Sequence, residues 1–215
     1  MKIFLDTAET DLIHQYFATG LIDGITTNPS LIRKSGKNPE DVYDDLKDLG
    51  VRDISMEVVG NAKEMYTEGK RLSKKFGDCC TIKVPCTPDG LLACRNLSRE
   101  VIKVNVTLIF SQVQAILAAK AGAAYVSPFV GRVNDNSFSG VELIEHISRT
   151  YKKHNVKTEI LAASLRDVFD VSKCYEVGAD VVTMPPKIFW GMYNHILTEK
   201  GLAKFNEDWR KVLDL

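Results

Sequence analysis

The sequence predicts an α/β fold: a single (β/α)8 TIM barrel over residues 1–215, with an additional C-terminal helix. Short apolar runs alternate with amphipathic helical patterns, and strand–helix–strand connections build parallel sheets. A length of 215 residues suits a compact closed barrel. The rival fold, an open doubly wound sheet, needs a glycine-rich turn after an early strand, and the sequence has no G-x-G-x-x-G motif.

Eight apolar runs are the expected strands, and they recur every 20 to 30 residues or so. They span residues 3–6, 24–28, 53–59, 81–85, 104–108, 123–127, 158–164 and 180–184. No linker or break in composition divides the series, so we expect one domain.

Helix signals fill the gaps between the expected strands. Asn61 with Glu64, and Ser111 with Gln114, have the spacing of a capping box at a helix start. The last expected helix covers roughly residues 202–213 and lies outside the strand–helix repeat. It carries an apolar stripe, which must cover something, so we expect it to pack in an oligomer.

The composition excludes several classes of protein. Hydrophobic residues make up 45% of the chain, and 28 basic residues balance 28 acidic ones. This balance argues against a nucleic-acid-binding protein that relies on overall positive charge. We expect no membrane span and no signal peptide, and therefore a cytoplasmic protein. Five cysteines without a C-x-x-C spacing favour free thiols over a disulfide framework or a zinc site.

Polar residues gather near the carboxyl ends of the expected strands, where barrel enzymes hold their chemistry. Strand residues alternate between two faces, and the face opposite the apolar one is polar in seven runs. These residues are Asp6, Asn28, Ser55, Glu57, Lys83, Asn105, Thr107, Ser127 and Ser164. An unpaired polar group inside a barrel costs about 1–3 kcal/mol, so the pattern indicates a functional site. An inert network of mutually satisfied groups is the alternative.

Lys83 is the sharpest single signal, because its two apolar neighbours should face the helices and its amine should point inward. Three other strand lysines, Lys2, Lys103 and Lys157, stand at strand starts, where we expect them to be solvated. Burial of Lys83 disfavours the charged ammonium, and a neutral amine can attack a carbonyl group to form an imine. The alternative is a structural salt bridge with Glu57 or Asp6, and spacing alone leaves both interpretations open.

The surrounding residues suit imine chemistry. Glu57 can act as the acid–base group, with a water held by Thr107, and Asp6 can take a hydroxyl proton during carbon–carbon cleavage. Arg132 and Arg166, together with Ser164, can bind a phosphate group at the late loops of a barrel. For each arginine alone, an ordinary surface position is the alternative.

Seven segments spread over the whole chain resemble those of transaldolases, specifically their short subfamily. They are FLDTA at residues 4–8, GITTNPS at 24–30, EV at 57–58, IKVP at 82–85, NVTLIFS at 105–111, YVSPFVGR at 125–132 and AASLR at 162–166. The resemblance implies a (β/α)8 barrel that works through a Schiff base and without a metal or organic cofactor. It also implies a homo-oligomer, a pentamer or decamer, whose C-terminal helix packs on a neighbouring subunit.

The resemblance also implies roles for individual residues. Lys83 would form the Schiff base, Asp6 would be the acid–base residue of bond cleavage, and Glu57 and Thr107 would handle the catalytic water. The substrate-binding residues would be Asn28, Asn105, Ser127, Phe129, Arg132, Ser164 and Arg166. The implied reaction moves a dihydroxyacetone unit from sedoheptulose 7-phosphate to glyceraldehyde 3-phosphate, in the pentose phosphate pathway. The products would be erythrose 4-phosphate and fructose 6-phosphate.

The main rival within the resemblance is fructose-6-phosphate aldolase, which releases free dihydroxyacetone. It differs by carrying Gln in place of Glu57 and Tyr in place of Phe129. An extra phenol can help to protonate the enamine, whereas an apolar ring leaves the enamine waiting for an acceptor aldehyde. Both positions therefore favour the transaldolase. A barrel that only binds phosphosugars is a third hypothesis, and it would lack the nucleophile or the base that this sequence keeps.

Overall fold

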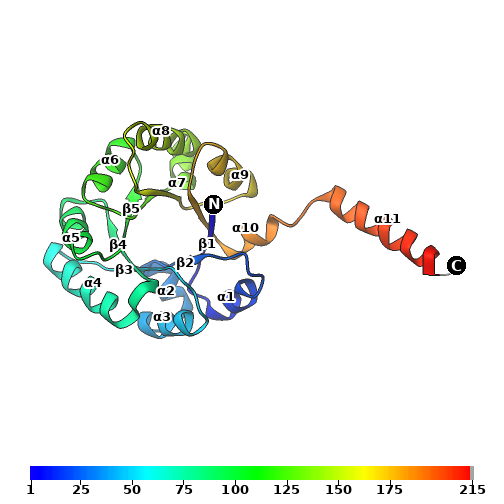
Figure 1. Cartoon of the computed structure of the whole chain (residues 1–215), viewed down its shortest axis with the longest axis horizontal. Helices are drawn as coiled ribbons and strands as arrows, with labels where there is room; N and C mark the ends of the chain where they lie inside the picture. Colours follow the sequence, from blue (N-terminus) through cyan, green and yellow to red (C-terminus); the bar gives the residue numbers. More distant parts are fainter. Residues whose placement is uncertain (214–215) are drawn as a thin grey trace.

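The computed structural model describes residues 1–213, and their eight parallel strands form a closed barrel. Each strand pairs with the next along the chain, and β8 returns to pair with β1, so that no sheet edge is left open. Helices surround the strands on the outside (Figure 1). The prediction of a single (β/α)8 barrel with a C-terminal helix is confirmed.

The strands match the expected apolar runs to within a few residues. They are β1 Lys2–Asp6, β2 Gly24–Thr26, β3 Ile54–Glu57, β4 Cys80–Pro85, β5 Val104–Ile109, β6 Tyr125–Pro128, β7 Glu159–Ala162 and β8 Val181–Met184. The helices are α1 Thr10–Phe17, α2 Pro29–Ser35, α3 Pro39–Asp48, α4 Ala62–Phe76, α5 Pro88–Arg99, α6 Gln112–Lys120, α7 Val130–Asp135, α8 Gly140–Lys153, α9 Val168–Glu176, α10 Pro186–Gly191 and α11 Ile196–Leu213.

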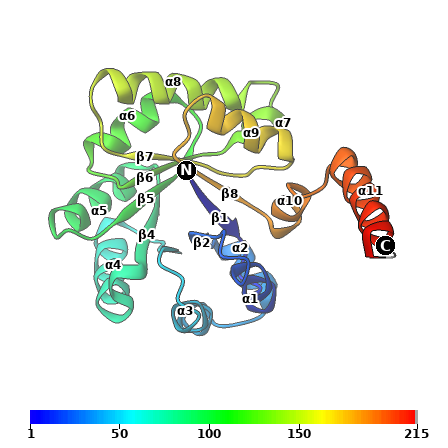
Figure 2. The ribbon, with the colours of Figure 1, turned by 45° about the vertical axis from the view of Figure 1, so that its right-hand side comes forward.

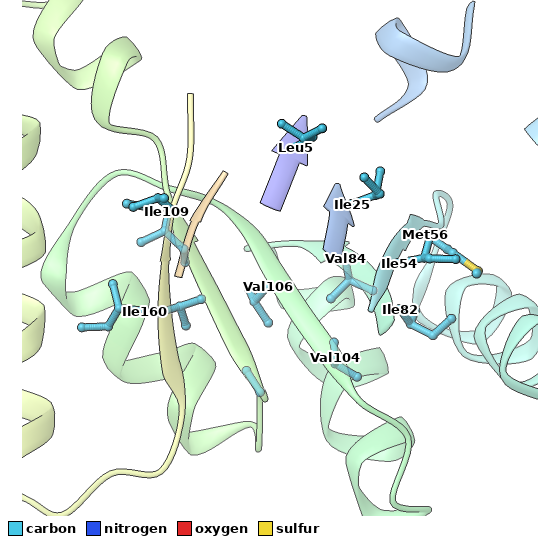
Figure 3. Close-up of a cluster of buried hydrophobic side chains, with 14 of the residues drawn as sticks. Leu5, Ile25, Ile54, Met56, Ile82, Val84, Val104, Val106, Ile109 and Ile160 are labelled. Carbon is cyan, nitrogen blue, oxygen red and sulfur yellow. The ribbon is translucent and has the colours of Figure 1, made fainter. Parts of the chain in front are cut away.

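The apolar face of the strands meets the helices, as strand alternation predicts. Ile54, Met56, Ile82, Val84 and Val104 are fully buried, and they belong to one large core between the strands and the surrounding helices. Figure 3 shows these side chains on their strands. Burying each of them from water contributes about 1.5–3 kcal/mol, so this outer core dominates the stability of the barrel.

A smaller apolar cluster fills the barrel itself. Phe4, Tyr125, Leu161, Ala163 and Val181 pack together apart from the outer core, and the rings of Phe4 and Tyr125 meet edge to face at 6.2 Å. Strand alternation places these residues on the inner face. This cluster, which we call the apolar plug, forms the floor beneath the carboxyl ends of the strands.

Beneath the apolar plug, polar side chains close the opposite end of the barrel. The buried carboxylate of Asp53 accepts hydrogen bonds from Thr81 (2.8 Å) and Tyr125 (3.0 Å), and Lys103 lies 3.4 Å from it. Lys2 forms an ion pair with Glu159 at 2.7 Å. Lys2 and Lys103 keep 40% and 38% of their side-chain surface exposed, so they are partly solvated as expected, and each also pairs with a carboxylate. Lys157 is exposed, as expected.

Two predicted helix starts have different outcomes. The capping box at Asn61 and Glu64 is complete, with reciprocal hydrogen bonds between side chain and backbone. At Ser111 the hydroxyl accepts from the backbone of Gln114, but the Gln114 side chain accepts from the backbone N–H of Phe110 at 2.8 Å. The second box is therefore displaced by one residue and is not reciprocal.

The C-terminal helix α11 begins at Ile196, six residues before the predicted start at 202. The helix continues through Gly201, because a single glycine costs a helix only about 1 kcal/mol and good helix formers lie on both sides of it. Figures 1 and 2 show α11 projecting from the barrel. Residues 214–215 lie outside the described residues. None of the helices within residues 1–213 is long and apolar enough to cross a membrane.

Candidate active site

A cavity of about 110 Å³ opens at the carboxyl ends of the strands, above the apolar plug. Side chains from seven of the eight strands or the loops that follow them line it. The lining residues are Asp6, Thr26, Asn28, Lys83, Thr107, Ser127, Phe129, Arg132, Leu161, Ala163, Ser164 and Thr183. Most of the polar residues predicted to share a site are therefore brought together.

Lys83 lies at the base of this cavity and is only 5% exposed. Its Nζ donates to the backbone carbonyl oxygen of Thr27 at 2.8 Å and to Glu57 Oε2 at 3.0 Å. The pairing of β3 with β4 sets Glu57 directly beside Lys83. The ion pair that the sequence offered as an alternative is thus present, yet the amine still lines the cavity. The Lys83 amine is therefore both paired with a carboxylate and part of the cavity lining.

Asp6 ends β1 and shares the cavity with Lys83. Its Oδ1 accepts a hydrogen bond from Thr26 at 2.7 Å, and the Thr26 hydroxyl lies 2.7 Å from that of Thr183. Protein atoms enclose the carboxyl group, although part of the residue borders the cavity. Burial raises the pKa of Asp6, and the nearby Lys83 ammonium opposes this effect only in part. A carboxyl group with a raised pKa holds a proton more readily than an ordinary one, which suits it to proton exchange with a substrate.

A second polar chain crosses the barrel from β3 to β6. Ser127 donates to Asn105 Oδ1 at 2.7 Å, and Asn105 Nδ2 donates to Ser55 at 3.2 Å. All three side chains are buried, and Asn105 lies below the cavity rather than in its lining. These contacts fix the Ser127 side chain at the cavity wall.

Thr107 differs from its neighbours because its buried hydroxyl has no hydrogen-bond partner within the described residues. It precedes Leu108, whose φ of 58° coincides with a register shift between β5 and β6. Such an irregularity aims a side chain differently from a regular strand. A buried hydroxyl without a partner costs about 1–3 kcal/mol, which a bound water or substrate would recover.

The two predicted arginines, Arg132 and Arg166, lie in different surroundings. Arg132 lines the cavity and lies over the Phe129 ring, 5.3 Å from its centre. Arg166 lies outside the lining and forms a two-pronged ion pair with Asp135 at the end of α7. The described structure therefore does not bring Arg166 into the cavity, because a carboxylate already occupies its guanidinium group.

Ser164 lines the cavity, but the strand alternation that placed it on the inner face was wrong. β7 ends at Ala162, and Ser164 has the parity of the outward Ile160. Its φ of 59° turns the chain so that the residue lines the cavity. Gly131 makes this turn possible, because a Cβ atom there would lie 2.2 Å from the Ser164 carbonyl oxygen.

Comparisons with known proteins agree with one another. Residues 3–215 match the family described as "Transaldolase/Fructose-6-phosphate aldolase". The chain is 50% identical to a probable transaldolase of Nitrosopumilus maritimus, over 99% of this chain and 96% of that protein. It is 49% identical to a probable transaldolase of Paracoccus denitrificans, over 98% of this chain and 97% of that protein. This chain belongs to the transaldolase family.

A likeness to one solved structure concerns the fold alone. A double variant of flavocytochrome b2, solved with sulfite bound, superposes with a TM-score of 0.63 at 13% identity. The match covers 86% of this chain and 56% of the other. It supports the barrel architecture of this transaldolase-family chain and says nothing about its substrate.

The predicted site residues take three kinds of position in this family member. Those that line the cavity are Asp6, Asn28, Lys83, Thr107, Ser127, Phe129, Arg132 and Ser164. Glu57 and Asn105 touch a lining residue, and Arg166 does neither. Asn28 has a second task, because its Oδ1 caps α2 by accepting from Leu31 at 3.0 Å. Within residues 1–213 no three His, Cys, Asp or Glu side chains are grouped as metal ligands would be.

The sequence analysis did not identify Thr26, which donates a hydrogen bond to Asp6, or Thr183, which is hydrogen-bonded to Thr26. Strand parity would have placed both on the inner face, since Thr26 shares parity with Asn28. A threonine in a strand is so common that only the position of its neighbours marks it as part of a site.

Proposed function

We propose that this protein is a transaldolase that acts through a Schiff base on Lys83. It would move a dihydroxyacetone unit from sedoheptulose 7-phosphate to glyceraldehyde 3-phosphate, giving erythrose 4-phosphate and fructose 6-phosphate in the pentose phosphate pathway of the cytoplasm. One observation carries the proposal: a buried lysine amine lines one cavity together with the carboxyl group of Asp6, and a second carboxyl group, that of Glu57, is hydrogen-bonded to the same amine. Membership of the transaldolase family agrees with it.

Imine formation would begin with Lys83 and Glu57. Glu57 takes a proton from the ammonium across their 3.0 Å contact, and the free amine attacks the ketone carbon of the donor sugar. The carbinolamine oxygen then leaves as water, with a proton returned by an acid in the site. The partnerless hydroxyl of Thr107 is the group that would hold this water.

Cleavage would follow at the bond between C3 and C4 of the donor. Asp6 takes the proton of the C4 hydroxyl, the C3–C4 electron pair moves toward the protonated imine, and an aldose leaves with a new carbonyl group. The three carbons left on Lys83 form an enamine, which attacks the carbonyl carbon of the acceptor aldehyde. Asp6 returns its proton to that oxygen. The raised pKa of Asp6 suits a group that takes up and releases a proton in every catalytic cycle.

The cavity mouth would bind the sugar phosphate. Arg132 and Ser164 both line the cavity, and Arg132 supplies a cation that can pair with a phosphate group. Arg166 could join them once the phosphate displaces Asp135 from its guanidinium group. Asn28, Asn105 and Ser127 would hold the sugar hydroxyl groups or the intermediate.

Borohydride trapping tests the mechanism. The protein is incubated with fructose 6-phosphate and borohydride, digested, and analysed by mass spectrometry, with a Lys83→Met variant as the control. The expected result is a dihydroxyacetone-sized adduct on the peptide that contains Lys83. An unmodified Lys83 peptide in wild-type protein that consumes the sugar would end the Schiff-base proposal.

Fructose-6-phosphate aldolase activity is the second candidate, because the family covers both reactions. The Phe129 ring lines the cavity and offers no hydroxyl group to protonate the enamine, which favours the transferase. A coupled assay with and without erythrose 4-phosphate separates the two. Fast release of free dihydroxyacetone without an acceptor would favour the aldolase, and a Phe129→Tyr variant should gain that release.

We also propose that the protein is a homo-oligomer in which α11 packs on a neighbouring copy. Phe205 and Trp209 are 71% and 63% exposed, and the helix projects from the barrel (Figure 2). An apolar stripe of this kind is costly in water and is typical of an interface.

A further inference from the structure

Asp6 is held through a chain of two hydroxyl groups that come from both of its neighbouring strands. β1 pairs with β2 on one side and β8 on the other, and each neighbour brings one threonine. Thr26 donates to Asp6 Oδ1 at 2.7 Å, and Thr183 lies 2.7 Å from Thr26. Within residues 1–213, no other side chain is hydrogen-bonded to the Asp6 carboxyl group. Both threonines are 2% exposed.

The direction of the hydrogen bonds along this chain depends on whether Asp6 carries a proton. When Asp6 is ionised, Thr26 must donate its only hydroxyl proton to the carboxylate, and Thr183 must then donate to Thr26. When Asp6 carries a proton on that oxygen, Asp6 can donate to Thr26, and Thr26 then donates to Thr183. The chain has two directions, and each direction places one proton in every short contact.

Other charged groups around Asp6 do not replace this chain. Lys83 on β4 favours the ionised carboxylate, and Glu57 on β3 disfavours it. Arg132 lines the same cavity, and the adjacent strands β2 and β8 contribute only hydroxyl groups. The lysine and the glutamate form a pair with each other, so their opposing effects on Asp6 partly cancel.

We propose that Thr183 is a positioning residue for Asp6. Acting through Thr26, it holds the carboxyl group in place and orients the Thr26 hydroxyl proton toward the carboxylate whenever Asp6 is ionised. This inference rests on the proposed function, in which Asp6 takes the C4 hydroxyl proton of the donor and returns it to the acceptor aldehyde oxygen. The transferred proton enters and leaves through the Asp6 carboxyl group, and each threonine keeps its own hydroxyl proton.

Removing the Thr183 hydroxyl affects the two protonation states unequally. Hydrogen bonds to a charged acceptor are about twice as strong as neutral ones, and neighbouring bonds in a chain strengthen each other. The ionised state therefore loses more than the neutral state. A Thr183→Val variant, which keeps the shape of the side chain, should raise the pKa of Asp6 by about 0.5 to 1. Thr183→Ser keeps the hydroxyl group and should leave that pKa at the wild-type value.

Infrared titration measures this pKa without any turnover. The carboxyl band that disappears in Asp6→Asn is followed against pH in the wild type, Thr183→Val and Thr183→Ser. Equal pKa values in all three proteins, or the same rise in both variants, would overturn the role of Thr183. A rise in the valine variant alone supports it. Because no sugar is present, this result does not depend on whether the protein proves to be a transaldolase.

The same three proteins then give the kinetic readout. We expect Thr183→Val to lower kcat about tenfold, to leave KM for the donor sugar unchanged, and to shift the Asp6 limb of the pH–rate profile upward. Thr183→Ser should restore the wild-type values. A rise in KM with unchanged kcat would show instead that Thr183 contacts the sugar, and would contradict the proposal. A wild type that fails to turn over phosphosugars would refute the proposed function and leave the infrared result standing.

Discussion

Gly131 provides a sharp test of how the cavity mouth is built. A Cβ atom at this position would lie 2.2 Å from the carbonyl oxygen of Ser164 and 2.9 Å from Nε of Arg166. Carbon and oxygen atoms that are not bonded approach to about 3.3 Å, so Gly131→Ala requires a shift of about 1 Å. The backbone resists it, because Gly131 and Val130 donate to Ser164 and Ala163 at 3.2 and 2.9 Å.

The expected cost of Gly131→Ala is about 1–3 kcal/mol in the free energy of unfolding, the usual range for an overpacked site. Because the substitution also displaces Ser164, we expect kcat/KM for fructose 6-phosphate to fall by up to about 100-fold. Urea unfolding and a coupled assay with erythrose 4-phosphate measure the two effects. Gly201→Ala is the matched control, since nothing lies within 4 Å of its added atom and it should stabilise α11 by roughly 0.5–1 kcal/mol. Wild-type stability and activity in Gly131→Ala would refute the reasoning.

Three further predictions concern other parts of the barrel. Burial holds the pKa of Asp6 above its ordinary 3.8, so the folded state binds more protons above pH 3.8 and loses stability as pH rises toward the folded pKa. Urea unfolding measured against pH should show the stability of Asp6→Asn rising relative to that of the wild type as pH increases from 3.8 toward the folded pKa of Asp6. A difference in unfolding free energy that does not change with pH would contradict this account. Tyr125→Phe removes a donor from buried Asp53, so it should cost about 1–3 kcal/mol while turnover is unchanged; equal stability in urea would contradict it. Light scattering should give wild-type protein a mass that is a multiple of 24.0 kDa, and Trp209→Glu should lower it; a monomeric wild type would rule out the oligomer.

The fold could be predicted because its signal is local and repeated. Each strand shows itself through apolar residues at alternate positions, and each of the runs around Lys83 and Asn105 also shows which side chains point inward. The same alternation correctly predicted five of the twelve residues that line the cavity: Asp6, Asn28, Lys83, Thr107 and Ser127. Parity is a property of a single strand, so it needs no knowledge of which strands are neighbours.

Features that depend on pairs of distant segments could not be predicted in this way. Thr26 and Thr183 are 157 positions apart in the chain, and they come into contact only because β8 pairs with β1 to close the barrel. The ion pair between Arg166 and Asp135 depends on how α7 crosses the loop after β7. Ser164 lines the cavity because its backbone is left-handed, and the sequence does not predict this conformation because serine seldom adopts it.

The apolar plug separates two polar compartments inside the barrel, and no side-chain hydrogen bond among the described residues connects them. Ions and hydroxyl groups around Asp53 lie on one side of the layer built on Phe4 and Leu161, and the reactive carboxyl and amino groups lie on the other. Free-energy changes in the two compartments should therefore add, since no side chain is shared between them. Substitutions at one end of the barrel can then change sugar preference without affecting the polar side chains around Asp53 at the other end.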